Sequence, residues 1–168
     1  NVYYGTYHQF YGGSAGSVET DKFAVSHIGS IENNVYGGLF EKLGTDSIAY
    51  VGGCLRNAVI AEGIVNNVYG GTYNGNWYGG SIGTGTVSCP SITNTISGGE
   101  GNKSENAYVY LGNGAPTFNG TVKSVINDFD AGKSYVMGGS TNVHNQPEGA
   151  DVAVETVITC SINIVFAL

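Results

Sequence analysis

The triplet Asn-Val-Tyr occurs three times at a constant spacing, and this recurrence constrains the fold more than any other feature of the chain. The copies begin at Asn1, Asn34 and Asn67, so both intervals are 33 residues. A fixed period of this length is typical of repeat architectures, in which each unit packs against the next along one axis. Each triplet leads into glycine and then an aromatic or apolar pair, as in Gly37-Gly38-Leu39-Phe40.

A second motif, an aromatic or apolar pair followed by Gly-Gly, accompanies each triplet. Its three copies are Phe10-Tyr11-Gly12-Gly13, Tyr50-Val51-Gly52-Gly53 and Trp77-Tyr78-Gly79-Gly80. Weaker copies lie near residues 109–112 and 135–140. We therefore interpret residues 1–168 as a single β-repeat domain, with units near 1–33, 34–66, 67–106, 107–134 and 135–168.

The runs between the glycines predict strands. They are short, rich in Val, Ile, Tyr and Thr, and bounded by Gly, Asn and Ser. No run combines helical periodicity with capping residues, so the predicted class is all-β. Three short strands per unit match one coil of a right-handed parallel β-helix, and we expect a solenoid of about five coils. An antiparallel, pilin-like β-sandwich with Gly-Gly at its hairpins is the alternative, and the long alternating stretch 152–166 favours it.

Stacked coils would align equivalent residues of successive units. The valines of the triplets would share one interior ladder, namely Val2, Val35 and Val68. The tyrosines that follow them would form a neighbouring exposed or corner ladder, namely Tyr3, Tyr36 and Tyr69. The pairs Asn33-Asn34 and Asn66-Asn67 would lie at turns, where stacked amides can hydrogen-bond from coil to coil.

Composition restricts the partners. The chain has 28 glycines and only three prolines, which indicates tight turns rather than a proline-rich linker. Its net charge is −7, and its six basic residues are scattered singly, so nucleic acid is not an expected partner. No apolar run reaches the roughly 18 residues of a membrane span. With charged residues at 11%, solubility has to come from Asn, Ser, Thr and Gly.

The chain begins with Asn1 rather than Met, which fits either a mature chain after signal removal or an excised fragment. We expect a secreted or cell-surface protein. Three cysteines, Cys54, Cys89 and Cys160, allow at most one disulfide, whose pairing stays open. The preferred interpretation is that they are small buried apolar residues.

One family resemblance follows from these motifs. Asn34-Val35-Tyr36-Gly37-Gly38 and the longer run 65–76 resemble the Gly/Tyr-rich NVYGG repeats of large adhesin-like β-helix surface proteins of bacteria. The resemblance covers residues 1–99 well and 100–168 poorly. It implies a parallel β-helix and a role in attachment or cell-surface display, and it supplies no catalytic residues.

Aromatic residues beside glycines are the candidate ligand-binding residues. A flat row of Tyr and Trp can stack on sugar rings or anchor a protein partner, although a ladder that merely closes coil corners is the preferred alternative. The candidates are Tyr4, Tyr7, Tyr11, Tyr73, Trp77 and Tyr78. Asp128 and Asp130 are candidate Ca²⁺ ligands, but a complete calcium loop is missing and a solvated turn is preferred.

Three functions from different classes remain. The first is a non-enzymatic extracellular structural or adhesin-like protein without cofactor. The second is a carbohydrate- or receptor-binding module, and the third is a β-helical polysaccharide-active enzyme, which would need converging acids and bases that the spacing does not indicate. No histidine, cysteine or serine pattern indicates zinc or a nucleophile, so we expect no catalytic residues and no enzyme.

The end of the chain predicts self-association. Residues 161–168 are uncharged along their side chains, apolar and strand-prone, so an exposed copy would pair readily with another strand. We expect head-to-tail association or a filament in which this segment completes a neighbouring sheet. Its alternating apolar residues are Ile162, Ile164, Phe166 and Leu168.

Overall fold

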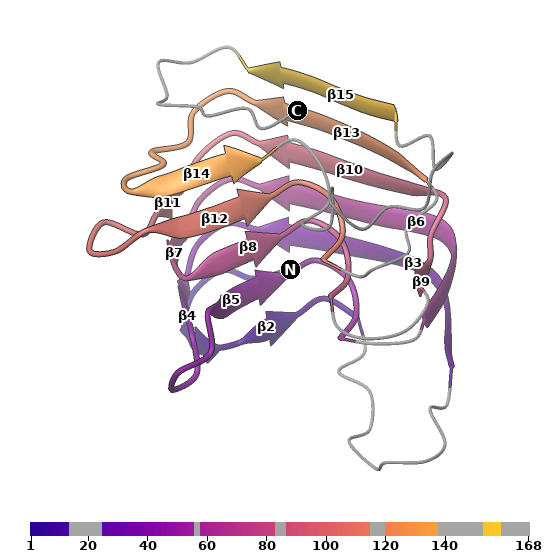
Figure 1. The fold of residues 1–168 in the computed structure, drawn as a ribbon, viewed down its shortest axis with the longest axis horizontal. Helices are drawn as coiled ribbons and strands as arrows, with labels where there is room; N and C mark the ends of the chain where they lie inside the picture. Colours follow the sequence, from indigo (N-terminus) through magenta and orange to yellow (C-terminus); the bar gives the residue numbers. More distant parts are fainter. Residues whose placement is uncertain (14–24, 56–57, 83–86, 115–119, 138–152, 159–168) are drawn as a thin grey trace.

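The computed structural model describes residues 1–13, 25–55, 58–82, 87–114, 120–137 and 153–158, whose regular structure is entirely β-strand. The strands form three parallel sheets that wind around one axis as a β-solenoid (Figure 1). Every strand pair in these segments is parallel. The predicted β-helix class is therefore confirmed, and the antiparallel sandwich is wrong.

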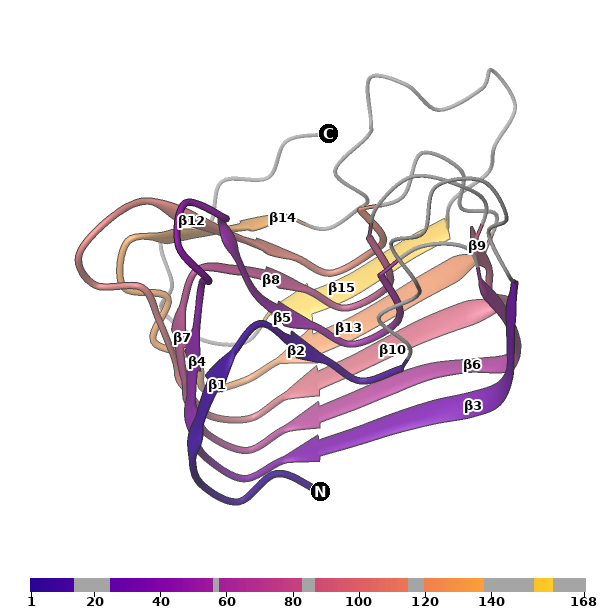
Figure 2. The same cartoon turned by 90° about the horizontal axis from the view of Figure 1, so that it is seen from below.

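Sheet A is the broadest layer and has the strand order β15-β13-β10-β6-β3, with β9 also paired to β6 (Figure 2). Its strands are β3 (Ser26–Val35), β6 (Ala58–Val68), β9 (Val87–Ser88), β10 (Ser91–Ile96), β13 (Thr121–Ile126) and β15 (Ala153–Ile158). The stretch that favoured a sandwich contains β15, which pairs in parallel with β13.

Sheets B and C complete each turn. Sheet B comprises β1 (Thr6–His8), β4 (Leu39–Glu41), β7 (Thr72–Asn74) and β11 (Glu100–Gly101). Sheet C comprises β2 (Phe10–Tyr11), β5 (Ile48–Val51), β8 (Asn76–Tyr78), β12 (Ala107–Tyr110) and β14 (Ser134–Met137). The four strands of sheet B mark off three turns, slightly fewer than the five coils predicted, while sheets A and C each continue to a fifth strand.

The valine ladder is confirmed. Val2 bridges to Val35, Val35 lies opposite Val68, and all three side chains are buried. The register continues the column through Ile96 and Ile126. Apolar residues at the same place in successive turns thus form a continuous core along the axis, as nearest-neighbour stacking of repeats requires.

The stacked amides are also confirmed, but their predicted place at turns is wrong. Asn33 and Asn66 lie inside β3 and β6 with their side chains buried in the core. Asn33 Nδ2 donates to Asn66 Oδ1 at 2.9 Å, and Asn66 Nδ2 donates to Asn94 Oδ1 at 2.8 Å. Asn94 Nδ2 continues the column to Ser124 Oγ at 2.9 Å. A buried amide is tolerated in a strand because the turn above and the turn below satisfy it.

Gly-Gly at the corner between sheets C and A makes room for this amide column. A Cβ on Gly52 would lie 2.4 Å from Asn66 Oδ1 and 2.5 Å from the carbonyl oxygen of Gly79. No side chain fits there. The motif is therefore a requirement of close packing between the corner and the amide column, not a hairpin.

Candidate functional site

The six aromatic residues predicted to bind a ligand do not form one row. Tyr73 and Trp77 are core residues, with exposed fractions of 1% and 2%. Tyr7 is half-buried and packs against the same core. Tyr11 and Tyr78 are half-buried on sheet C, and Tyr4 alone is largely exposed, at 83%. Because Tyr73 and Trp77 point inward, the predicted stacking platform built from these six residues is not formed.

The inward rings form two interior ladders instead. On sheet B, Tyr7 stacks on Phe40 and Phe40 on Tyr73, with ring centroids 5.2 and 4.8 Å apart. On sheet C, an equivalent stack has centroid distances of 5.1 and 5.2 Å and consists of Phe10, Tyr50 and Trp77. The two ladders meet edge to face, as between Phe40 and Tyr50 at 83°. Aromatic pairs of both geometries are favourable, so these rings bind the turns to one another.

Burial determines the ionisation of the interior phenols. It raises the pKa of both Tyr50 and Tyr73 well above the usual range, so both hydroxyls stay protonated and available as donors. Tyr50 OH donates to Asn66 Oδ1 at 3.1 Å, and Tyr73 OH donates to the carbonyl oxygen of Gly70 at 3.2 Å. These phenols satisfy buried hydrogen-bond acceptors of the core and are unavailable to a ligand.

The exposed tyrosine row has different members and confirms the ladder predicted for the triplets. Tyr3 stacks on Tyr36 and Tyr36 on Tyr69, each with centroids 4.9 Å apart. Their exposed fractions are 59%, 47% and 47%. In the next turn Ser97 follows Ile96, the residue opposite Val68, so the row ends at Tyr69. Tyr36 therefore stacks between the other two rings of the row.

A shallow groove of about 460 Å³ lies beyond this row, at the corner between sheets A and B. Four glycines and three polar residues line it, namely Gly38, Gly70, Gly71, Gly99, Thr72, Glu100 and Asp130. The backbone geometry and close packing of this corner require glycine in the lining. Gly71 has φ +105°, and a Cβ on Gly70 would lie 2.6 Å from the carbonyl oxygen of Tyr36.

Two carboxylates and one lysine border the groove. Lys103 Nζ forms ion pairs with Glu100 and, at 3.4 Å, with Asp130 Oδ2. Hydrogen bonds from Lys103 and from the Thr72 hydroxyl hold the pKa of Glu100 below its usual value. The backbone N–H of Gly132, together with Lys103, lowers the pKa of Asp130 in the same way. Both groups are therefore ionised acceptors at neutral pH, suited to hydroxyl donors of a ligand.

The two predicted calcium ligands, Asp128 and Asp130, have different surroundings. Asp130 pairs with Lys103 through Oδ2 and accepts the Gly132 N–H through Oδ1, whereas Asp128 has an exposed side chain and Phe129 between them is buried. Within the described segments, no group of three or more His, Cys, Asp or Glu side chains is arranged to hold a metal ion. A calcium site at these residues stays a prediction.

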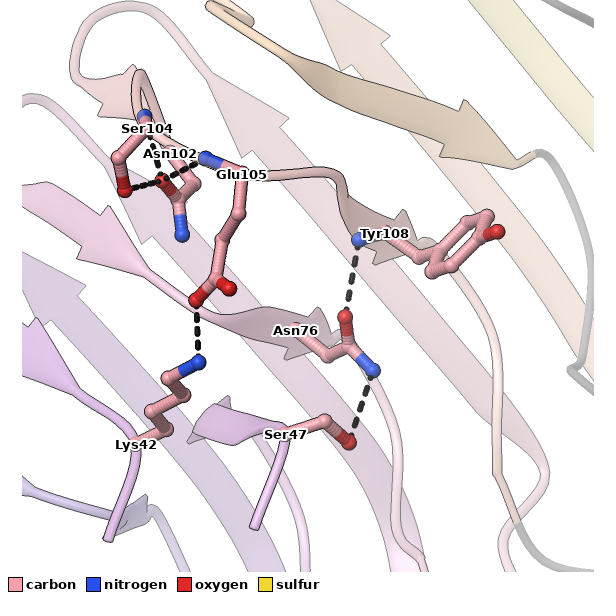
Figure 3. Close-up of polar contacts among 7 residues, drawn as sticks. All are labelled: Lys42, Ser47, Asn76, Asn102, Ser104, Glu105 and Tyr108. Carbon is pink, nitrogen blue, oxygen red and sulfur yellow. Dashed lines mark hydrogen bonds and ion pairs between the residues drawn. The ribbon is translucent and has the colours of Figure 1, made fainter. Parts of the chain in front are cut away.

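A polar network that sequence reasoning missed lies at the corner between sheets B and C (Figure 3). The backbone N–H of Tyr108 donates to Asn76 Oδ1 at 3.0 Å, and Asn76 Nδ2 donates to Ser47 Oγ at 3.2 Å. Lys42 and Glu105 form an ion pair across two turns. These side chains connect three successive turns, so the network stabilises the stack at this corner.

Asn102 organises the loop that carries Glu105. Its Oδ1 accepts hydrogen bonds from the N–H of Ser104 at 2.9 Å and from the N–H of Glu105 at 3.1 Å (Figure 3). This side chain-to-backbone pattern is typical of Asn in turns. The only sequence signal for it is the Asn-Lys-Ser turn, which by itself does not indicate that Glu105 reaches Lys42.

A second tyrosine stack involves sheet C. Tyr78 stacks on Tyr110 at 5.0 Å, and Tyr110 contacts Tyr108 at 5.5 Å. Burial, with smaller contributions from the neighbouring phenols, raises the pKa of Tyr110 to about 12. Tyr78 and Tyr110 are half-buried, and Tyr108, at 39%, is less exposed than any residue of the row at Tyr36.

Two of the three cysteines lie in the described segments. Cys54 and Cys89 are buried thiols, as expected for small apolar residues, and burial raises the pKa of Cys89 to about 11. Cys160 and the assembly residues Ile162, Ile164, Phe166 and Leu168 lie outside the described residues. No helix in the described segments is long and apolar enough to span a membrane.

Comparison of the chain with models of known protein families, with curated proteins and with solved structures gives no match.

Proposed function

We propose that this chain is a non-enzymatic structural or adhesin-like protein of the cell surface or extracellular space, assembling head to tail through its terminal strands. One observation carries the proposal: the residue types that dominate the sequence are used in contacts between turns. Asparagine forms the amide column, Tyr and Phe form the aromatic ladders, and glycine makes the corners. Such a chain builds a scaffold along one axis rather than a reaction centre.

The first turns support the assembly part of the proposal. On the outer side of β3, the described residues provide a strand partner only near its end, where Val2 bridges to Val35. Among the described segments β3 is the end strand of sheet A, and we expect a parallel strand from a second copy to extend the sheet beside it. The apolar segment 161–168 of a second copy has the composition of such a strand.

A carbohydrate-binding function is the second candidate, and the glycine groove favours it. Its volume of about 460 Å³ lies in the range of small-molecule sites, which is about 300–1,000 Å³. Glu100 and Asp130 supply ionised acceptors for sugar hydroxyls. Tyr69 directly precedes Gly70 of the groove, and its ring is the last in the exposed row.

The same electrostatics argue against hydrolysis at this groove. Glycoside cleavage needs one carboxylic acid that is still protonated near neutral pH in order to donate to the leaving oxygen. Both groove carboxylates have lowered pKa values and lie beside a lysine. The polysaccharide-active alternative therefore receives less support from this site than simple binding does.

Surface labelling tests the main proposal. Antibody raised against the purified protein should label intact cells of the source organism as strongly as permeabilised ones. Labelling that requires permeabilisation would contradict a surface location. In parallel, incubation with a polysaccharide panel should release no new reducing ends.

A glycan array with matched variants tests the groove. Glu100→Gln removes a groove carboxylate, while Glu62→Gln removes an exposed carboxylate in β6 on the outer side of sheet A. If sugars bind in the groove, the first variant loses the array signal and the second retains it. Equal signals from both variants would exclude the groove as the sugar site.

A further inference from the structure

The exposed tyrosine row combines two properties, near-parallel alignment of its rings and access to solvent. Its rings are nearly parallel, with interplanar angles of 7° for Tyr3 and Tyr36 and 14° for Tyr36 and Tyr69. All three rings are also open to solvent by about half of their surface. The Tyr78–Tyr110 stack is half-buried, and Tyr50 and Tyr73 are enclosed in the core.

We propose that this row is a site of oxidative cross-linking, at which a peroxidase acting with hydrogen peroxide joins Tyr36 covalently to Tyr3 or to Tyr69 as dityrosine. This proposal goes beyond the function proposed above and does not depend on it. It adds a covalent bond between the side chains of two turns that also contact each other through hydrogen bonds, ring stacking and the buried valine column.

The reaction balances with one peroxide for each cross-link. Each phenol gives up one electron and one proton and becomes a phenoxyl radical. The two radicals form one carbon–carbon bond between ring carbons ortho to the hydroxyls, and each ortho hydrogen then moves to oxygen, which restores both aromatic rings. The two electrons and two protons reduce one hydrogen peroxide to two water molecules.

The backbone keeps the reacting rings together. Tyr36 N–H donates to the Val2 carbonyl oxygen at 2.7 Å, and Tyr69 N–H donates to the Val35 carbonyl oxygen at 2.7 Å. These bonds hold the three tyrosines at equivalent positions of adjacent turns. Two phenoxyl radicals formed there are already neighbours and need not diffuse to meet. Such preorganisation greatly raises the effective concentration of the partners. The rings only have to tilt, which their exposed position at a corner allows.

Neighbouring tyrosines provide the comparison. Tyr4 is the most exposed tyrosine of the described segments but stacks on no ring there. It would form a radical readily yet lack a partner within the same molecule. Tyr110 has a partner, but burial raises its pKa to about 12 and reduces access of an oxidant. Tyr108 is 39% exposed and stacks on Tyr110, but those two rings are 5.5 Å apart and inclined by 24°, so the row at Tyr36 has the closer and more nearly parallel exposed rings.

The experiment uses the full chain, dilute, with horseradish-type peroxidase and hydrogen peroxide. Dityrosine is measured by its blue fluorescence and located by tryptic mass mapping. Trypsin cuts after Lys22, Lys42, Arg56 and Lys103, so the fragment 23–42 contains Tyr36 as its only tyrosine. A cross-linked fragment pair that contains 23–42 and is two hydrogens lighter than its parts identifies the predicted bond.

Tyr36→Phe is the decisive variant, because phenylalanine keeps the ring in the stack but cannot form a phenoxyl radical. It should lose the 23–42 product and most of the fluorescence, while Tyr4→Phe should retain both. Circular dichroism checks that both variants fold like the parent. The proposal is overturned if fluorescence in Tyr36→Phe equals that of the parent. It is also overturned if the main product joins fragments 57–103 and 104–123. It is likewise overturned if the dityrosine fluorescence per mole of protein rises with protein concentration, as it would for an intermolecular product.

Discussion

Replacing Asn66 with alanine should destabilise the protein more than any comparable change on the surface of sheet A. The Asn66 side chain is completely buried and takes part in four hydrogen bonds of 2.8–3.1 Å. Alanine removes the acceptor of Tyr50 OH and the donor to Asn94 Oδ1, which are both buried. An unsatisfied buried polar group costs about 1–3 kcal/mol, so these two groups alone cost about 4 kcal/mol.

Asn67 is the matched control, since it is the next residue of the same strand and points to the outer face. It is half-buried and donates one side-chain hydrogen bond of 2.9 Å, to Asn34 Oδ1. Asn67→Ala should cost only about 1 kcal/mol. Urea unfolding followed by circular dichroism measures both values. Equal losses in the two variants would refute the view that the interior amide column holds the turns together.

Three further predictions concern a corner, a pair of carboxylates and the end of the chain. Gly52→Ala should lower the free energy of unfolding in urea by about 2 kcal/mol or more, because the new Cβ would overlap Asn66 and the Gly79 carbonyl. The control Gly29→Ala, whose Cβ would have no atom within 4 Å, should change it by no more than about 0.5 kcal/mol. A similar loss in both variants would contradict the packing argument. The pKa values of Glu100 and Asp130 are lowered in the folded protein, so their stabilising effect is complete above their usual values of 4.5 and 3.8 and is lost as the pH falls through the folded values. The urea midpoint should therefore decrease below about pH 4.5, and it should decrease less in Glu100→Gln. A pH profile that this variant leaves unchanged would mean that the groove carboxylates contribute nothing to stability. Deleting residues 161–168 should lower the mass measured by light scattering at high concentration, and a parent protein that is already monomeric there would rule out assembly through this segment.

The solenoid class was predictable because the period survives in the first units. Asn33 and Asn66 are 33 residues apart in the amide column. The next steps, to Asn94 and Ser124, are 28 and 30 residues, and the column changes from Asn to Ser. A search for a constant spacing therefore loses the later turns, although their backbone register is maintained.

The candidate site was less predictable, because adjacent aromatic residues point to opposite faces of a strand. Trp77 is buried in the core while Tyr78 lies on the other side of β8, and nothing in the pair Trp-Tyr indicates which residue is inside. Hydrophobic patterning fails where both faces carry rings. Asn66 was misplaced for a related reason, since the usual preference of asparagine for turns is overridden by partners in the neighbouring turns.

The groove and the network at Asn76 depend on contacts between residues far apart in sequence. Lys42 and Glu105 are separated by 63 residues, and Lys103 reaches Asp130 from another turn. Their meeting depends on loop conformations at the corners, which local patterns do not determine.

The amide column also gives the solenoid a polarity. Every amide in it donates toward the C-terminal neighbour, from Asn33 to Asn66, then to Asn94 and finally to the Ser124 hydroxyl. Hydrogen-bond dipoles aligned in this way reinforce one another. The column therefore has a carbonyl acceptor at its Asn33 end and a hydroxyl at its Ser124 end. Two such columns joined in the same direction would continue the alignment, whereas two joined pole to like pole would oppose it. Any fibre built from these solenoids would therefore have two chemically different ends and grow differently at each.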